Sequence, residues 1–169
     1  MTSARRQRKS GFARALRCPI WGLILIVGLA LPHGLGAATT ERVVVDRHTG
    51  LAIDGFDPLA YFIDGEAKAG RPAYEYRFAG VIWRFRNEGN RAAFSENPDF
   101  YMPCFGGYDP VAVARGVAAP GSPLLWVVTG QRLYLFFNGN SRELFATQLD
   151  RTVIAAEGKW LGVRSVLVP

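Results

Sequence analysis

The feature that most constrains the fold is an alternation of aromatic and charged side chains over residues 74–78, repeated over residues 81–86 after an Ala-Gly pair. Successive side chains of a β-strand point to opposite faces, so a period of two indicates strands with one buried face. The glycine-containing break between the two segments predicts a β-hairpin. We expect Tyr76 and Trp83 on its apolar face and Arg84 on its charged face.

A second hairpin is predicted from residues 125–128 to residues 133–137, with its turn at residues 129–131. Both segments are apolar throughout, and they do not alternate. Continuous apolar character is typical of strands that are buried on both faces. We therefore expect this pair at the centre of the sheet.

Short helices are expected after each hairpin. Asn87 predicts the start of a helix that ends near Pro98, because proline lacks the amide hydrogen that continues a helix. Asn140 and Glu143 resemble a capping pair for a second helix over residues 142–149. The predicted fold class is α+β, a small antiparallel sheet of β-hairpins with short helices, and we identify no internal repeat.

The N-terminal 38 residues predict export. Six of the 20 Lys and Arg residues lie before residue 18, and an uncharged apolar stretch follows over residues 19–31. A positive flank, a short apolar core and small residues at Gly36 and Ala38 are typical of a secretory signal peptide cleaved after Ala38. The alternative is an uncleaved anchor in the inner membrane formed by residues 19–38. Either way the domain is periplasmic or secreted.

The exported part is predicted to be one domain over residues 51–162. It is preceded by a flexible arm over residues 39–50 and followed by a C-terminal tail over residues 163–169. Cys18 lies in the leader, so Cys104 is the single thiol of the exported part. The fold must therefore be stable without an internal disulfide.

Charge and motifs exclude several functions. The 14 Lys and Arg residues that remain after the leader balance all 14 Asp and Glu residues, and nucleic-acid-binding proteins keep a positive excess. We expect no nucleic-acid partner, and membrane contact only through the N-terminal segment. The sequence has no phosphate-binding glycine loop, no paired CxxC elements and no HExxH motif. A catalytic pair of Cys104 with His48 is disfavoured because His48 lies in the arm, and we favour a non-enzymatic role.

Two segments carry a family resemblance. Residues 52–62 read Ala-Ile-Asp-Gly-Phe-Asp-Pro-Leu-Ala-Tyr-Phe, and residues 97–108 read Asn-Pro-Asp-Phe-Tyr-Met-Pro-Cys-Phe-Gly-Gly-Tyr. Together with Trp126 and the segment 133–135, they resemble the small exported proteins with a YHS domain, over about residues 51–160. The resemblance implies an α+β fold and a suspected role in metal binding.

The chain departs from that family at one position. The family typically places cysteine, or selenocysteine in some members, directly after its Gly-Gly-Tyr segment, which is Gly106, Gly107 and Tyr108 here. Asp109 occupies that position in this chain. A carboxylate cannot exchange disulfides and is a harder metal ligand than a thiolate. The loop from Cys104 to Asp109 is therefore the predicted site. We expect it to be a degenerate thiol site, because Asp109 stands where the family has cysteine.

Three functions remain open. In the first, the domain binds a metal ion or a small ligand through Cys104 and Asp109, with Asp54 and Asp57 as further oxygen donors. In the second, it is a structural or interaction protein of the cell envelope, with no identified protein partner. In the third, it is a thiol-redox protein. The structural alternatives are a buried apolar role for Cys104 and turn formation by Asp54 and Asp57. Clustering of these four residues around one cavity would favour binding, and their dispersal would favour the interaction protein.

Overall fold

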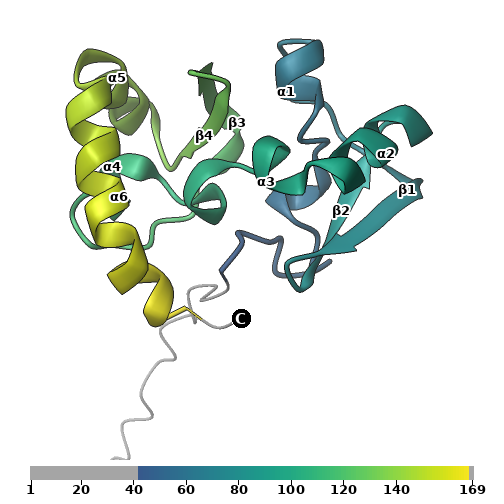
Figure 1. The fold of residues 1–169 in the computed structure, drawn as a ribbon, viewed down its shortest axis with the longest axis horizontal. Coiled ribbons are helices and arrows are strands. Elements are labelled where there is room, and N and C mark those ends of the chain that lie inside the picture. The colour runs from purple at the N-terminus through teal and green to yellow at the C-terminus, as the bar shows by residue number, and fades with distance from the viewer. Residues whose placement is uncertain (1–41, 168–169) are drawn as a thin grey trace, which may run out of the picture. The chain divides into compact units, whose positions relative to one another are not determined.

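The computed structural model describes residues 42–167. The predicted leader, its cleavage site and the start of the arm lie outside the described residues. The described part contains two β-hairpins, each followed by helices (Figure 1). In chain order the elements are η1 (Ile53–Gly55), α1 (Ala60–Ile63), β1 (Arg71–Phe78), β2 (Val81–Phe85), α2 (Glu88–Glu96), α3 (Pro98–Tyr101), η2 (Cys104–Gly107), α4 (Pro110–Val113), β3 (Ser122–Thr129), β4 (Arg132–Phe136), α5 (Gly139–Thr147) and α6 (Leu149–Ser165).

The first hairpin forms as predicted. β1 and β2 pair antiparallel, with Tyr76 opposite Trp83. Trp83 is 0% exposed, and its ring lies 5.1 Å from that of Phe94 on α2. On the other face Arg84 Nε lies 2.7 Å from a carboxylate oxygen of Glu75. The alternation in the sequence therefore identified both the hairpin and its buried face.

The second hairpin also forms, but it does not join the first in one sheet. β3 pairs only with β4, so the described residues contain two separate two-stranded sheets. α3 lies between the two hairpins in Figure 1. Burial on both faces holds for most of β4, whereas β3 is half-buried and Leu124 on it is 65% exposed. The predicted α+β class is confirmed, and the prediction of a central strand pair is wrong.

The helix prediction is right after the first hairpin and misplaced after the second. Asn87 caps α2 by accepting a hydrogen bond from the amide of Asn90, and α2 ends at Glu96. The second cap is Asn138, not Asn140, and it accepts from the amide of Ser141. The chain then breaks at Gln148, and α6 continues to Ser165.

The described parts of the predicted flexible arm and of the predicted C-terminal tail both contribute buried residues. In the arm, Val43, Val44 and Val45 are buried, and the amide of Val44 donates to the carbonyl of Gly106 at 2.8 Å. The predicted tail begins inside α6, where Val163 is buried in the core. Apolar burial orders both segments, although each is short and flanked by polar residues.

The two hairpins belong to an internal structural repeat, which the sequence analysis missed. β1 and β3 begin 51 positions apart, at Arg71 and Ser122. The same shift relates β2 to β4 and the two capping residues Asn87 and Asn138. The shift also relates Phe94 to Phe145, the buried aromatic of each following helix. Each hairpin is thus covered by its own short helix in the same way.

The repeat extends to the segment before each hairpin. η1 leads to Asp57 and η2 leads to Asp109, and each aspartate is followed by proline and a short helix. Gly55 accepts a backbone hydrogen bond from Gly70, and Gly107 accepts one from Gly121, each at 2.9 Å. A Cβ atom on Gly70 would lie 2.5 Å from the backbone of Arg84, and one on Gly121 would lie 2.6 Å from Leu135. These glycines permit the same close approach in both halves.

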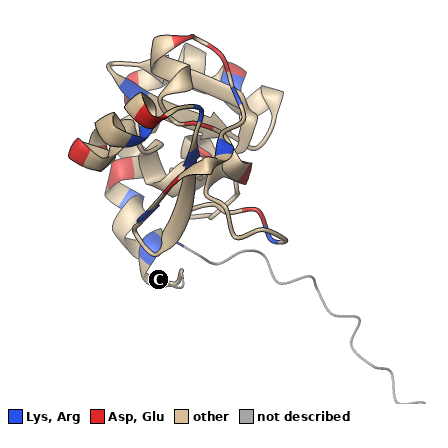
Figure 2. Ribbon diagram, turned by 90° about the vertical axis from the view of Figure 1, so that its right-hand side faces the viewer, with Lys and Arg blue, Asp and Glu red and all other residues tan. Residues whose placement is uncertain are grey.

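Charged residues are distributed along the whole described fold. Figure 2 shows basic and acidic residues interleaved along the ribbon of the described residues. None of the described helices is both long enough and apolar enough to span a bilayer.

Candidate functional site

A cavity of about 500 Å³ lies where the two repeats meet. Its lining comes from the turn of the first hairpin, the segment from α3 to η2, the first residue of β4, helix α6 and the start of the described chain. Cavities of this volume are typical of small-molecule sites. Its lining includes Arg42, Asp99, Cys104, Arg132, Trp160 and Arg164.

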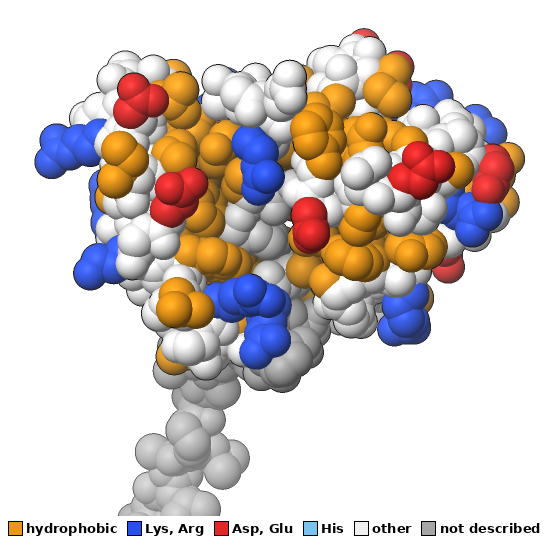
Figure 3. Space-filling view, in the orientation of Figure 1, with side chains coloured by type: hydrophobic (Ala, Val, Ile, Leu, Met, Phe, Trp, Pro, Cys, Tyr) orange, Lys and Arg blue, Asp and Glu red, His pale blue; other side chains and the backbone are white. Residues whose placement is uncertain are grey.

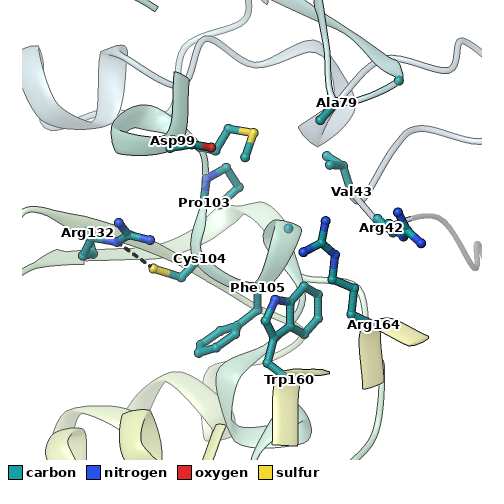
Figure 4. A pocket seen from close by; sticks show the side chains of 13 residues that line it. Arg42, Val43, Ala79, Asp99, Pro103, Cys104, Phe105, Arg132, Trp160 and Arg164 are labelled. Carbon is teal, nitrogen blue, oxygen red and sulfur yellow. Dashed lines mark hydrogen bonds between the residues drawn. The ribbon is translucent and has the colours of Figure 1, made fainter. Parts of the chain in front are cut away.

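Cys104 and Arg132 form a direct contact on one wall of this cavity. Arg132 Nε donates a hydrogen bond to Cys104 Sγ at 3.2 Å, drawn as the dashed line in Figure 4. Cys104 is 8% exposed. The contact with the sulfur raises the pKa of the Arg132 guanidinium above its usual value. Cys104 is therefore a polar partner as well as a buried side chain.

Tyr134 lies on the same strand as Arg132, and its pKa is also affected by the Cys104 side chain. Burial, together with the nearby Cys104, raises the pKa of the Tyr134 phenol to about 12. The ring of Tyr134 packs on Phe145 with centroids 4.8 Å apart. The phenol therefore remains neutral at physiological pH.

Two further arginines line the cavity from other elements. Arg164 comes from α6, and Arg42 lies at the start of the described chain. Figure 4 shows their guanidinium groups near each other, across the cavity from Arg132. Trp160, one turn before Arg164 on α6, packs edge-on against Phe105 with centroids 5.7 Å apart. These two rings supply an apolar side to a basic cavity.

The charge of the cavity is positive. Among the described residues that line it are three arginines, and Asp99 is the one carboxylate of that described lining. Figure 3 shows basic side chains on either side of the hollow in the middle of this face, with an acidic side chain at its edge. Like charges around one concave surface focus their field and raise the local concentration of oppositely charged solutes. The cavity is therefore suited to anions.

The four predicted site residues do not come together. Cys104 lines the cavity described above, whereas Asp54 lines a separate one with Asp46 and His48. Partial burial and the nearby Asp46 carboxylate raise the pKa of Asp54. Asp57 and Asp109 are buried and line neither cavity.

Asp57 and Asp109 have the same structural role in the two repeats. One oxygen of Asp109 accepts from the amide of Val111 at 2.8 Å, and the other accepts from the amide of Phe137 at 3.0 Å. Asp57 repeats this pattern with the amides of Leu59 and Arg86, at 2.9 and 2.8 Å. Each carboxylate ties the start of a short helix to the end of its hairpin. Both of its oxygens are thereby occupied by backbone donors.

The glycine loop shapes one wall of the cavity and packs into the core. Gly106 lines the cavity, while Gly107 and Tyr108 are buried. Phe105 and Gly106 have φ values of 55° and 63°, so the loop turns through the left-handed region. Cys104, which precedes this turn, lines the cavity, and Asp109, which follows it, caps α4. Among the described residues, no group of three or more His, Cys, Asp or Glu side chains could hold a metal ion.

The repeat offers an internal comparison for the residues of the cavity. Asp57 and Asp109 are identical because both copies of the fold need them. By contrast, the position of Arg132 is Val81 in the first repeat, and that of Cys104 is Ala52. The first repeat forms the same hairpin and turn with these apolar residues. The fold of one repeat therefore does not require the Cys104–Arg132 pair.

Sequence reasoning identified Cys104 but missed Arg42, Arg132, Trp160 and Arg164. These residues belong to three separated segments and form no motif. Only an alignment of the two repeats would have singled out Arg132, as a charged residue where the other copy is apolar.

Comparison of the chain with protein-family models, curated proteins and solved structures found no match.

Proposed function

We propose that this chain is an exported, YHS-like binding module that takes a small anionic ligand in the cavity between its two repeats. The observation that carries the proposal is the presence of three arginines, with one carboxylate, around a single cavity of about 500 Å³. Guanidinium groups bind carboxylates and phosphates through paired hydrogen bonds, and they keep their charge at all physiological pH values. Trp160 and Phe105 would contact the apolar part of the ligand.

A metal ion does not fit the same residues. The four side chains predicted as ligands are dispersed, and Asp57 and Asp109 already accept backbone hydrogen bonds with both oxygens. Arg132 also places a positive charge against the one thiol. The positive field of the cavity would oppose a cation. The geometry therefore favours an anionic ligand over a metal, and a purely structural role in the cell envelope is the outcome if no ligand binds.

Anion binding is testable by calorimetric titration of the purified full-length protein at fixed ionic strength. Butyrate is expected to bind, whereas propylammonium, with the same propyl chain and the opposite charge, is not. Arg164→Gln should weaken butyrate binding by about 5-fold, because an exposed ion pair is worth about 1 kcal/mol. Arg132→Gln, on the opposite wall of the cavity, should weaken it less. Arg142→Gln on α5 is the matched control, since Arg142 does not line the cavity. Equal binding of both probes, or equal effects of all three variants, would contradict the proposal.

Thiol exchange is the second candidate, and the contact between Arg132 and Cys104 favours it. In this reaction the Cys104 thiolate attacks one sulfur of a small-molecule disulfide, whose S–S bond breaks. The other half leaves as a thiolate and takes up a proton from water. Cys104 is thereby oxidised to a mixed disulfide and the leaving half is reduced. With one cysteine in the exported part, the reaction stops at the mixed disulfide.

Thiol exchange predicts a charge preference. Cys104 should react about 5-fold faster with the anionic disulfide dithionitrobenzoate than with neutral dithiodipyridine, after correction for the rates of free cysteine. Arg164→Gln should reduce this preference because it removes charge from the cavity without altering the Cys104–Arg132 contact. Stopped-flow absorbance measures both rates. A preference that Arg164→Gln leaves unchanged would exclude a role for the cavity in selecting the disulfide.

A further inference from the structure

The basic groups of the cavity are divided between two walls. Arg132 reaches the cavity from the start of β4, on the side of Cys104 and Pro103. Arg164 reaches it from α6, with Arg42 beside it. Figure 4 shows these two groups on opposite sides of the open space. A ligand with one anionic group can contact only one of these walls closely.

Apolar side chains line part of the space between the two walls. Trp160 and Phe105 border it on one side, and Val43 and Met102 also line the cavity. A charged group placed there would lose its water without gaining a partner, which costs free energy. An apolar spacer would lose nothing by the same burial. The cavity therefore matches a molecule with charged ends and an apolar middle.

The two walls differ in net charge. Asp99 lies on the side of Arg132, and its charge acts on that guanidinium. Figure 4 shows Arg164 and Arg42 near each other, and the one carboxylate of the described lining, Asp99, lies on the other side. The wall of Arg164 is thus the stronger anion site, and the wall of Arg132 is the weaker one. One anionic group is expected to dock first at Arg164, and the second adds affinity at Arg132.

We propose that the ligand is a small dicarboxylate whose acidic groups are separated by a short apolar chain, with one carboxylate at Arg164 and the other at Arg132. This inference rests on the proposed function, because it specifies the ligand of the same cavity. It assigns a separate role to each arginine. Arg164 binds any carboxylate, and Arg132 distinguishes a dicarboxylate from a monocarboxylate.

The test is a calorimetric series on the full-length protein at fixed ionic strength. Succinate, glutarate and adipate are compared with butyrate, valerate and hexanoate, which have the same numbers of carbon atoms. The best dicarboxylate is expected to bind at least about 10-fold more tightly than its monocarboxylate counterpart, the gain that one further charge-assisted hydrogen bond supplies. The gain should peak at one chain length, because the two walls are a fixed distance apart.

Variants separate this inference from the proposed function. Arg132→Gln should reduce dicarboxylate affinity to that of the monocarboxylate. Arg164→Gln should weaken both classes of ligand, and Arg142→Gln should leave the gain unchanged. If butyrate binds but no dicarboxylate binds more tightly, the inference is overturned and the proposed function stands. If no carboxylate binds, both are overturned. A gain in dicarboxylate affinity that is the same for every chain length and persists in Arg132→Gln would reflect nonspecific electrostatic attraction. That result would also overturn the inference.

Discussion

Replacing Asp109 with alanine is expected to lower the free energy of unfolding by about 3–5 kcal/mol. Its carboxylate accepts hydrogen bonds from the amides of Val111 and Phe137, and it is buried. A hydrogen bond to a charged group contributes about 1.5–3 kcal/mol, and a buried donor left without a partner adds a desolvation penalty. The loss would also detach α4 from the second hairpin. Urea denaturation followed by circular dichroism measures the change.

The internal repeat supplies a second copy of this experiment. Asp57→Ala removes the equivalent hydrogen bonds to Leu59 and Arg86 and should have a cost of similar size. Glu143→Ala on α5 is the control, because this exposed carboxylate has no such role, and its cost should be below about 0.5 kcal/mol. Costs for the two aspartates as small as that of Glu143 would refute their role as ties between helix and hairpin.

The same role determines what is expected of Asp109→Cys, the substitution that introduces the cysteine expected from the resemblance to the YHS family. A thiol is a weak hydrogen-bond acceptor and cannot hold two backbone amides. The new sulfur would also be buried beside α4, while Cys104 faces the cavity on the other side of the turn. The substitution is thus expected to destabilise the fold without creating a two-thiol site.

Trp83→Ala is expected to unfold the protein or nearly so, with a cost of about 3–5 kcal/mol. Trp83 is fully buried, packs on Phe94 of α2, and donates its indole N–H to the carbonyl of Phe78 at 3.2 Å. Its removal leaves a cavity in the largest core cluster of the described residues. A shift of the urea midpoint, or loss of the near-ultraviolet dichroism, reports the effect.

The neighbouring residue provides the control for Trp83. Arg84 lies on the outer face of the same strand, where it pairs with Glu75 at 2.7 Å. Arg84→Ala should cost less than about 1 kcal/mol, because a partly exposed ion pair contributes little net stability. Equal costs for Trp83→Ala and Arg84→Ala would mean that the two faces of the hairpin are assigned wrongly.

Local patterns in the sequence predicted those elements that local physics determines. The alternation around Trp83 identified the first hairpin, and Asn87 identified the start of α2. The separation of the two hairpins into different sheets was not predictable in this way. It depends on which helix covers which strand pair, and the sequence of one hairpin does not contain that information.

The internal repeat had a signal in the sequence that was not used. Gly-Phe-Asp-Pro at residues 55–58 and Gly-Tyr-Asp-Pro at residues 107–110 are near copies. The two aspartates are 52 positions apart and the two caps are 51 apart, so an alignment with a one-residue gap would have placed the second helix cap at Asn138, by analogy with Asn87. It would also have identified Asp57 and Asp109 as structural residues, because a residue present in both repeats is expected to support the fold that the two repeats share.

The candidate site itself was beyond prediction for a different reason. Arg42, Arg132 and Arg164 are far apart in the sequence, and each alone looks like an ordinary surface charge. They form one site because η2 packs on β4 while α6 packs on α4, and side chains from these elements and from the start of the described chain line the same cavity. Long-range packing, which no periodic pattern records, brings them together.

The most direct test of the central claim is a nuclear magnetic resonance titration of the isotope-labelled protein with glutarate. Binding in the cavity predicts saturable shifts of the Trp160 indole, of the backbone amides from Cys104 to Gly107, and of the Arg132 and Arg164 side chains. The same titration of Arg164→Gln should show weaker shifts at these positions. Shifts that stay linear and spread over arginines outside the cavity, such as Arg142 and Arg151, would contradict the claim that this cavity is an anion-binding site.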